Sequence, residues 1–423
     1  MKALIRKGTA DGFTVRIPPS KSLSHRALIV SALADGTSKI IHPADNRDMK
    51  ATIRCLRLLG ARIHEEGDHC IVEGIGGSDR YDGSLIDCSE SGSTLRFLIP
   101  VFAMTGKPSL FTGQGRLMDR PLDVYADLFG KQSLPFEMKD RILHLQGPLS
   151  PGEFSLRGDI SSQFITGLLL TLPLLPGDSV IRITEPYESR SYVALTEDVL
   201  QDAGITFHDH GLTIGIPGGQ KYHGRTYTVD GDDSQAAFFL CLACLTHQSA
   251  DVLSLRHDSH QPDHRIIDIL RTMGAEIMEI EDGYRIIPHE LHGCTIDLAD
   301  CPDLGPVLFA LAAAAEDTSV FVNAGRLRYK ESDRIAAMEE ELRKLGCDIS
   351  SDETTVTVHG GAELHGTELD GHGDHRVVMS LSVLAASMQE PVMIKGCEAA
   401  DKSYPGFLED LRSTGTEVTM YDR

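Results

Sequence analysis

Basic and hydroxyl side chains gather on short polar turns that lead into apolar helical stretches. Lys21, Arg26, Arg96 and Arg376 lie on or near such turns. A serine or an aspartate is enough to cap a helix N-terminus, so capping explains the hydroxyls and leaves the cations without a local role. Helix N-termini and cations both attract anions, and hydroxyl and amide groups donate to phosphate oxygens. The turns therefore predict a site for small anions, with neutral donors from Ser22, Ser24, Ser91, Ser93, Thr94, Ser161, Ser162 and Gln163.

Three further strings carry more charge than a fold requires. Opposite charges alternate over residues 328–334, just before an amphipathic stretch, and Asp333 there is explained equally well by a local ion pair. Residues 115–121 and 401–407 place a cation close to the start of a predicted helix. The candidates from these strings are Arg120, Lys330, Glu331, Arg334 and Lys402.

The elements that must position these residues follow from a repeat of about 71 residues, in which a capped turn and an apolar run return six times. The turns lie at residues 20–22, 91–93, 161–163, 232–234, 303 and 374–376. A second mark keeps the same period, because an amphipathic stretch in each unit ends at a glycine: Gly60, Gly130, Gly204, Gly274, Gly346 and Gly415. Short β-branched runs between the marks read as strands.

Each unit is thus predicted to be helix, strand, helix, strand, strand, which makes an α/β protein. Six such units over 423 residues exceed one hydrophobic core, so two lobes of three units are expected. We place one lobe at residues 20–229 and the other at residues 1–19 plus 230–423, with crossovers near 18–20 and 229–231. Met1 to Ile17 reads as a single first strand that returns to the discontinuous lobe.

Composition excludes several classes of function. The formal charge of −22 repels nucleic acid and anionic membranes, and the longest apolar segment is too short to span a bilayer. The nine cysteines have no framework spacing and read as reduced thiols, and the start of the chain does not resemble a signal peptide. A cytoplasmic enzyme that acts as a monomer, with neither nucleic acid nor membrane as partner, is expected.

Eight motifs follow one another along the whole chain: PSKSLSHRAL from Pro19, SGSTLRFL from Ser91, GRLMDRPL from Gly115, ISSQF from Ile160, DCPDL from Asp300, RLRYKESDRI from Arg326, GDHRVVMSL from Gly373 and DKSYPGF from Asp401. With these motifs in this order, the chain resembles the 5-enolpyruvylshikimate-3-phosphate synthases. The resemblance implies a two-lobed inside-out α/β barrel. It also implies that phosphoenolpyruvate joins the 5-hydroxyl of shikimate 3-phosphate with release of phosphate, without metal or organic cofactor.

The resemblance also assigns residues to the two substrates. Shikimate 3-phosphate would be bound by Lys21, Ser22, Arg26, Ser161, Ser162, Gln163, Ser189, Tyr192, Asp303 and Lys330. Phosphoenolpyruvate would be bound by Lys21, Gly92, Arg120, Gln163, Arg334, Arg376 and Lys402. The lobe of residues 20–229 would thus serve mainly the first substrate and the other lobe the second, in one pocket between the lobes.

Addition followed by elimination needs one acid and one base whose roles reverse in the second half-reaction. Asp303 is expected near the 5-hydroxyl, Glu331 and Lys21 are expected to transfer protons, and Lys402 completes the catalytic set. Which group is acid and which is base in each half-reaction stays open.

Some residues depart from the family pattern, and two rival functions are disfavoured. Glu90 and Arg326 stand where many members have Asn, so their roles stay open. His257, His260 and His264 have a metal-like spacing on a predicted loop, where no metal is expected.

One rival function is that of the sister transferase acting on UDP-N-acetylglucosamine, which opens with a Lys-Asn pair and uses a loop cysteine. Here Lys21 is followed by Ser22, and residues 113–121 contain no cysteine. The other rival is a non-catalytic repeat scaffold, in which charges should recur at matching positions of all six units. Instead, the Lys and Arg residues cluster in particular units.

Overall fold

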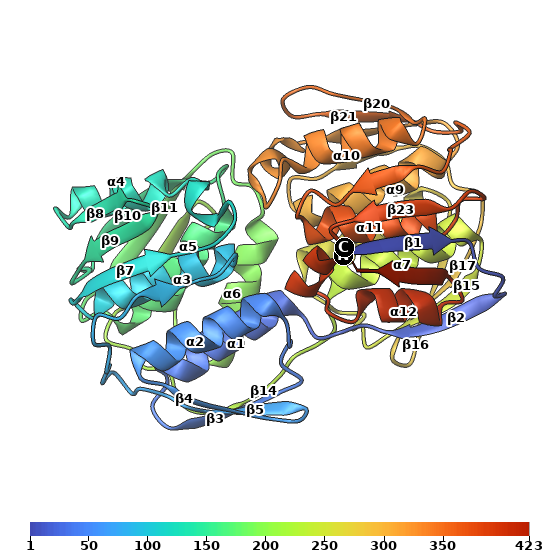
Figure 1. Cartoon of the computed structure of the whole chain (residues 1–423). Helices are drawn as coiled ribbons and strands as arrows, with labels where there is room; N and C mark the ends of the chain where they lie inside the picture. The colour runs from blue at the N-terminus through green and yellow to red at the C-terminus, as the bar shows by residue number, and fades with distance from the viewer. Residues whose placement is uncertain (423) are drawn as a thin grey trace. The chain divides into compact units, whose positions relative to one another are not determined.

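The computed structural model describes residues 1–422 and divides into two compact units (Figure 1). Unit 1 comprises Met1–Pro18 together with the chain from Asp230 onward, and unit 2 comprises Pro19–Val229. Over the described residues, each unit contains three four-stranded sheets and six α-helices and has its own hydrophobic core.

Unit 2 contains the first half of the repeat. Its helices are α1 (Lys21–Leu33), α2 (Arg47–Leu59), α3 (Gly92–Met104), α4 (Asp123–Lys131), α5 (Ser162–Thr171) and α6 (Arg190–Asp202). Its strands are β3 (Thr37–Ile41), β4 (Arg62–Glu66), β5 (His69–Glu73), β6 (Ile86–Asp87), β7 (Pro108–Thr112), β8 (Phe136–Lys139), β9 (Ile142–Gln146), β10 (Glu153–Arg157), β11 (Ser179–Thr184), β12 (His208–Asp209), β13 (Thr213–Ile216) and β14 (Thr226–Thr228). Short 3₁₀ helices η1 (Leu117–Asp119) and η2 (Leu172–Leu174) lie in the loops.

Unit 1 contains the second half and the N-terminal strands. Its helices are α7 (Asp233–Thr246), α8 (Ile266–Thr272), α9 (Gly305–Ala314), α10 (Arg334–Lys344), α11 (His375–Ala385) and α12 (Phe407–Ser413). Its strands are β1 (Lys2–Arg6), β2 (Gly12–Arg16), β15 (Ser249–Leu253), β16 (Glu276–Ile280), β17 (Gly283–Ile287), β18 (Thr295–Asp297), β19 (Thr318–Val322), β20 (Asp348–Ser351), β21 (Val356–His359), β22 (Glu368–Asp370), β23 (Val392–Lys395) and β24 (Glu417–Tyr421). Its 3₁₀ helices are η3 (Pro262–Arg265), η4 (Pro302–Leu304), η5 (Gly325–Tyr329) and η6 (Cys397–Lys402).

Buried helices form the interior of each unit, α1, α3 and α5 in unit 2 and α7, α9 and α11 in unit 1, while the other helices keep one exposed face and the sheets lie outside. In unit 1, α7, α9 and α11 contact one another, and every residue from Asp233 to Leu245 is buried. The strands are instead buried on alternate residues, so one face of each sheet packs inward and the other is solvated. Figure 1 shows this layering within each unit. The inside-out α/β architecture expected from the sequence is confirmed.

The repeating unit has one more strand than the sequence predicted. In the sheet β6-β7-β9-β8 a short strand precedes the capped helix and pairs in parallel with the next strand. The other five sheets contain an equivalent strand. Strands such as β6, with two residues, are too short to show the alternation of apolar and polar residues by which strands are recognised.

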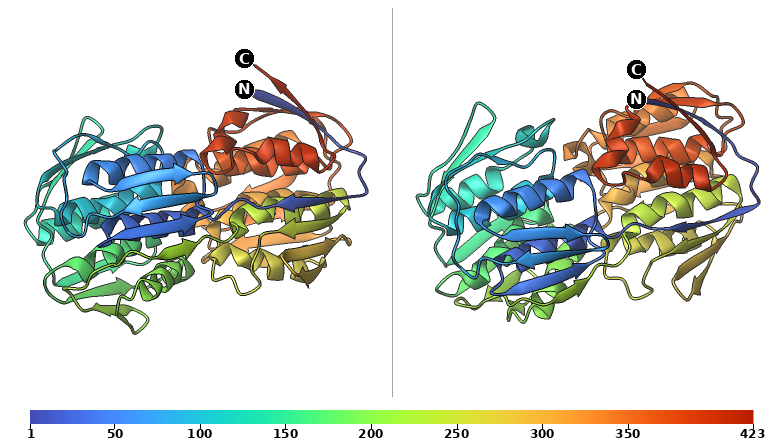
Figure 2. Two further views of the ribbon diagram at one scale, coloured as in Figure 1. Left: turned by 90° about the horizontal axis from the view of Figure 1, so that it is seen from below. Right: turned by 60° about the horizontal axis from the view of Figure 1, so that its bottom comes forward.

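The expected single strand from Met1 to Ile17 is wrong, because the segment forms two strands in two different sheets of unit 1. β1 lies between β23 and β24 in one sheet, and β2 pairs in parallel with β15 in another. Figure 2 shows the N-terminal strand, in blue, beside the C-terminal one, in red. In unit 2 too, a sheet is completed by strands from opposite ends of the segment, because β14 pairs in parallel with β3.

Most of the predicted helix signals are present as local structure. Ser20, Ser91, Ser161, Asp232 and Asp374 each accept a backbone N–H at the start of a helix. Asp303 does not: it lies inside η4, and α9 has no side-chain cap. Gly130 is predicted to end a helix but lies within α4, and Ser133 takes the left-handed conformation two residues after that helix.

Candidate functional site

Lys21 is the first residue of α1, and its position is fixed by the capping serine before it. Ser20 Oγ accepts the N–H of Leu23 at 3.4 Å. The Lys21 ammonium lies 3.1 Å from the carboxylate of Asp48, which is in the first turn of α2 and is buried. Nothing in the sequence indicated this partner, because an acidic residue in the first turn of a helix is also common for reasons of the helix dipole.

Arg26 lies one turn further along α1 and is buried, with its guanidinium hydrogen-bonded to residues of α1 and α6. It donates to the carbonyl of Ser22 at 2.8 Å, to the carbonyl of Tyr192 at 2.8 Å and to Thr196 Oγ1 at 2.9 Å. The guanidinium also stands over the ring of Phe97, 5.3 Å from its centroid. Burial lowers the pKa of Arg26 to about 10, so the side chain stays charged at neutral pH. The contacts tie α1 to α6 and make Arg26 part of the framework that holds Ser22 and Tyr192.

The N-termini of α3 and α5 bring Gly92, Arg96, Arg120 and Gln163 together. A Cβ atom on Gly92 would lie 2.8 Å from Nη1 of Arg120 and 3.4 Å from Oε1 of Gln163, so only glycine leaves this space open. Gln163 accepts from Arg96 Nη1 at 2.8 Å and donates to Ser93 Oγ at 3.0 Å. Two guanidinium groups and an amide thus surround Gly92, which has no side chain.

The remaining predicted residues of unit 2 lie at helix starts. Ser161 caps α5 by accepting the N–H of Gln163 at 3.3 Å, and Ser162 is buried at the first position of that helix. Ser189 precedes α6 with a φ of 53°, a left-handed conformation that is unfavourable for serine. Tyr192 is half-buried in the first turn of α6.

In unit 1 the carboxylate of Asp303 meets three cations. Its Oδ1 lies 3.0 Å from Lys330 Nζ and 3.0 Å from Arg334 Nη1, and its Oδ2 lies 3.2 Å from Arg376 Nη2. Burial alone would raise the pKa of Asp303, but the three cations hold it well below its usual range. Asp303 is therefore an anion at neutral pH.

Arg334, the first residue of α10, joins three carboxylates. Its Nη2 lies 2.9 Å from Glu331 Oε2 and its Nε lies 2.9 Å from Asp374 Oδ2, in addition to the contact with Asp303. Glu331 in turn accepts from Lys402 Nζ at 3.0 Å. Burial would lower the pKa of Arg334, but the carboxylates, with Asp374 first, raise it above its usual value.

Asp374 carries a double role that the sequence did not reveal. Its Oδ1 caps α11 by accepting the N–H of Arg376 at 2.9 Å, while its Oδ2 binds Arg334 and Ser332. Burial opposes ionisation, yet Arg334 lowers the pKa of Asp374 to about 2. In the sequence, the turn 374–376 is recognisable only by its capping aspartate and by Arg376.

Arg376 and Lys330 complete the cluster. Arg376 donates to Ser234 Oγ at 2.8 Å and to the carbonyl of Asp303 at 3.1 Å, and Ser234 in turn donates to the capping Asp232. Burial lowers the pKa of Lys330 to about 8, against the opposing effect of Asp303.

The structure thus joins the predicted residues of unit 1 into one network, named here the Asp303 cluster: Asp303, Lys330, Glu331, Arg334, Arg376 and Lys402. In unit 2 it brings Gly92, Arg120 and Gln163 together and places Ser22 and Tyr192 around Arg26. Asp48, Asp374 and Ser234 belong to these networks but were not among the predicted site residues.

The open alternatives have local explanations. Asp333 caps α10 and pairs with Arg328 at 3.3 Å, as a local ion pair would. Glu90 is exposed and its carboxylate lies toward Gly115. Both ring nitrogens of His264 contact protein groups, Asp233 Oδ1 at 3.2 Å and the Tyr284 hydroxyl at 3.1 Å.

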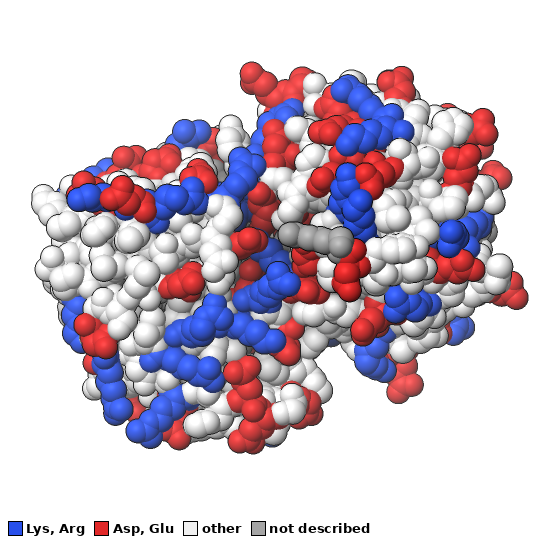
Figure 3. All heavy atoms as spheres, in the orientation of Figure 1, with Lys and Arg blue, Asp and Glu red and all other residues white. Residues whose placement is uncertain are grey.

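Surface charge and helix length complete the description. Figure 3 shows acidic and basic side chains interspersed on the visible face of unit 1. Among residues 1–422 no helix combines the length and the apolar character that crossing a bilayer demands.

Comparisons with known proteins agree with these motifs. The model of the family described as EPSP synthase (3-phosphoshikimate 1-carboxyvinyltransferase) matches residues 6–411. The chain is 42% identical to the 3-phosphoshikimate 1-carboxyvinyltransferase of Clostridium kluyveri over 408 residues, which are 96% of this chain and 95% of the relative. The protein of the same name from Clostridium novyi is also 42% identical, over 95% of this chain and 94% of its own. A solved structure of EPSP synthase from Acinetobacter baumannii superposes with a TM-score of 0.82 at 26% identity, covering 99% of this chain and 100% of that one.

Proposed function

Since the chain belongs to the EPSP synthase (3-phosphoshikimate 1-carboxyvinyltransferase) family, we propose that it transfers the enolpyruvyl group of phosphoenolpyruvate to the 5-hydroxyl of shikimate 3-phosphate. Inorganic phosphate is released in this step of the shikimate pathway. The observation that carries the proposal is the Asp303 carboxylate, held among three cations in a protein whose formal charge is −22. Cations concentrated against the overall charge serve a small anionic substrate.

We assign phosphoenolpyruvate to the lobe of residues 1–19 with 230–423 and shikimate 3-phosphate to the lobe of residues 20–229. Each lobe also contributes residues to the other substrate. Phosphoenolpyruvate is bound by Arg334, Arg376 and Lys402 of unit 1 and by Lys21, Gly92, Arg120 and Gln163 of unit 2. The planar guanidinium groups bind carboxylate or phosphate in a bidentate manner and so orient the substrate. The space left open by Gly92 beside Arg120 and Gln163 supports this assignment, because a side chain there would occupy the position of a ligand.

Shikimate 3-phosphate is assigned to the residues around Arg26 and to the edge of the Asp303 cluster. Ser22, Arg26, Ser161, Ser162, Gln163, Ser189 and Tyr192 come from unit 2, together with Lys21, and Asp303 and Lys330 come from unit 1. Arg26 acts chiefly by holding Ser22 and Tyr192, since its guanidinium donates to groups of the protein itself. Hydroxyl donors at helix N-termini suit phosphate oxygens.

Substrate anions would replace the internal carboxylates as partners of the cations. Without substrate, Lys330, Arg334 and Arg376 pair with Asp303, and a carboxylate among three cations is a weak base. When phosphate and carboxylate groups of the substrates bind the same cations, the pKa of Asp303 rises. Binding thereby turns Asp303 into a base strong enough to accept the proton of the 5-hydroxyl.

The reaction is an addition followed by an elimination. The 5-hydroxyl oxygen bonds to C2 of phosphoenolpyruvate as its proton passes to Asp303, and C3 takes a proton from Glu331 or Lys21 to become a methyl group. In the second half-reaction C3 returns a proton and the C2–O bond to phosphate breaks. Lys402, 3.0 Å from Glu331, keeps the charge of that carboxyl balanced in both halves.

Phosphate release distinguishes this function from that of the sister transferase. Purified protein is incubated with phosphoenolpyruvate and either shikimate 3-phosphate or UDP-N-acetylglucosamine. Phosphate release is expected when shikimate 3-phosphate is the acceptor and not when UDP-N-acetylglucosamine is. Release only with UDP-N-acetylglucosamine would overturn the assignment, and binding of both substrates without release would favour the scaffold alternative.

We further propose that the protein works as a monomer in the cytoplasm and acts on these small molecules alone. The nine cysteines are free thiols, and all but Cys294 are buried, which suits a reducing compartment. Sedimentation at micromolar concentration should give a mass near 46.1 kDa. A mass of twice that value would exclude the monomer.

A further inference from the structure

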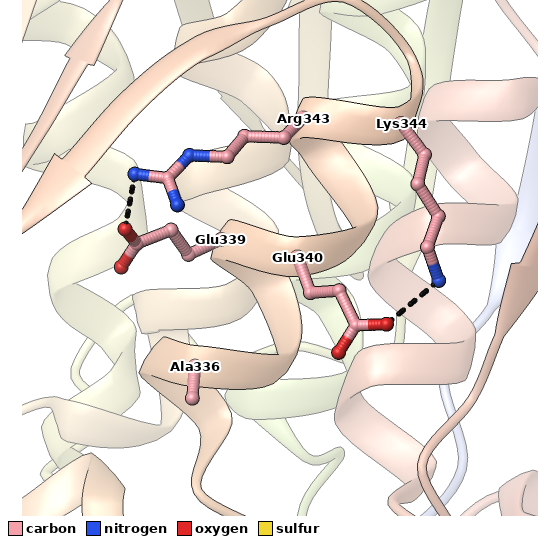
Figure 4. A pocket seen from close by; sticks show the side chains of 5 residues that line it. All are labelled: Ala336, Glu339, Glu340, Arg343 and Lys344. Atoms are coloured by element: carbon pink, nitrogen blue, oxygen red, sulfur yellow. Dashed lines mark ion pairs between the residues drawn. The ribbon is translucent and has the colours of Figure 1, made fainter.

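Helix α10 has two faces with different ion pairs. On its outer face Glu339 pairs with Arg343 and Glu340 pairs with Lys344, around a shallow hollow on the helix surface (Figure 4). Pairs of this kind, four residues apart on a helix surface, contribute roughly a few tenths of a kcal/mol to helix stability. Glu341, the next residue, is 0% exposed and points into unit 1. A buried carboxylate needs a reason beyond the helix itself.

The buried carboxylate of Glu341 binds the turn that leads from β22 to α11. Its Oε2 accepts the backbone N–H of Asp370 at 3.0 Å, and its Oε1 accepts from His372 Nε2 at 2.7 Å. Lys344 Nζ lies 2.8 Å from the same Oε1 and supplies the compensating positive charge. The same ammonium group also pairs with Glu340, so the charge of both carboxylates is balanced within the protein.

The turn held by Glu341 contains Asp374, which contacts Arg334, and Arg376, which contacts Asp303. Gly371 accepts the N–H of Asp374 at 2.9 Å, and Asp374 is followed by His375 and Arg376 at the start of α11. His372 has a φ of 49°, an unfavourable conformation that needs support from its surroundings. The same helix, α10, therefore contacts the segment 370–376 twice: through Arg334 and Asp374 at its first residue, and through Glu341 two turns later.

We propose that Glu341 is a positioning residue of the enolpyruvyl transferase site, which fixes the 370–376 turn so that Asp374 and Arg376 meet Arg334 and Asp303 in the geometry that binds phosphoenolpyruvate. This inference rests on the proposed function. Glu341 touches no substrate and acts only through the turn. Partners that orient a ligand-binding side chain in this way commonly change affinity or activity by about 10- to 100-fold when removed.

The test compares Glu341→Gln with Glu340→Gln, which removes a carboxylate that contacts the same Lys344 ammonium from the outer face. The amide introduced by Glu341→Gln has one oxygen, which cannot accept from the Asp370 N–H and from both His372 and Lys344. Glu341→Gln is expected to raise the KM for phosphoenolpyruvate about tenfold, with a change of less than about threefold in kcat and in the KM for shikimate 3-phosphate. Glu340→Gln is expected to match the unaltered protein.

A double-variant cycle separates positioning from general destabilisation. In an Arg376→Lys background, Glu341→Gln should have little further effect on the KM for phosphoenolpyruvate, because both changes disturb one contact. Independent effects that multiply would overturn the proposal, as would equal losses in Glu341→Gln and Glu340→Gln.

Should Glu341→Gln fail to fold, His372→Phe removes one donor to Glu341 from a partly exposed side chain and should raise the KM for phosphoenolpyruvate by a smaller factor. An unchanged KM in His372→Phe would also overturn the proposal. Failure of the unaltered protein to release phosphate would count against the proposed function instead.

Discussion

Each lysine of the predicted site is held by one carboxylate. The pairs are Lys21 with Asp48, Lys330 with Asp303 and Lys402 with Glu331. An ammonium group is a compact charge on a flexible stem, so a fixed carboxylate keeps it in place until a substrate anion arrives. In the proposed mechanism Asp303 gains basicity in this way, once substrate anions bind its cationic partners.

Replacement of Asp303 by Asn tests this at the reacting group. Asp303→Asn removes the proposed proton acceptor and leaves Lys330, Arg334 and Arg376 without their shared anion. We expect kcat to fall by about 10²-fold or more, measured as phosphate release at saturating substrates. Asp333→Asn is the matched control: Asn caps α10 about as well as Asp, so turnover should be unchanged. Equal turnover in the two variants would refute the role of Asp303.

Lys330 predicts a pH dependence of substrate capture. Its pKa falls from 10.5 in the unfolded chain to about 8 in the free protein, so the ammonium form proposed to bind shikimate 3-phosphate is lost as pH rises through about 8. The value of kcat/KM for shikimate 3-phosphate should therefore decline above about pH 8, since this ratio reports the ionisations of the free enzyme. Lys330→Arg keeps the charge and should move the decline to higher pH. A decline unaltered in Lys330→Arg would assign it to another group.

Between about pH 8 and 10.5, Lys330 also affects the free energy of unfolding. The folded protein binds fewer protons at this site than the unfolded chain between about pH 8 and 10.5, so this group makes the protein more stable as pH rises across that window.

At the scale of elements, capped helix starts place the site residues. Ser20 caps α1 and the adjacent Lys21 points to Asp48, so neighbouring residues on one turn have separate roles. Ser20→Ala should lower the free energy of unfolding by about 1 kcal/mol with turnover retained. Lys21→Ala should lower turnover by roughly two orders of magnitude. Urea unfolding and phosphate release measure the two effects, and similar turnover in both variants would refute the role given to Lys21.

At the scale of the molecule, strands that are far apart in the sequence pair to complete a sheet in each unit. β1 lies between β23 and β24, so its backbone pairs on both sides with strands from the far end of the chain. Leu4→Pro removes a backbone donor from this central strand and should destabilise unit 1 by on the order of 3 kcal/mol. Calorimetry should show unit 1 unfolding at a lower temperature. Lys7→Pro, in the loop after β1, is the control and should leave the transition unchanged.

The sequence by itself determined the repeat, the helix starts and the residue types of the site, because caps and amphipathic periods depend on neighbours within one or two turns. The motifs from Ser20 to Lys402 also carried the family resemblance. Short strands such as β6 and the split of Met1–Ile17 into β1 and β2 were missed, since pairing partners, not local pattern, define them.

Only the tertiary structure decided which charges meet. Asp303 and Lys330 lie 27 residues apart in the chain, and Glu331 and Lys402 lie 71 apart. Asp48, Asp374 and Glu341 look in the sequence like ordinary acids at or on a helix, and packing alone makes them partners of Lys21, Arg334 and the 370–376 turn. Burial then sets their ionisation, because the energy of a charge depends on the solvent and the counter-charges that the fold places around it.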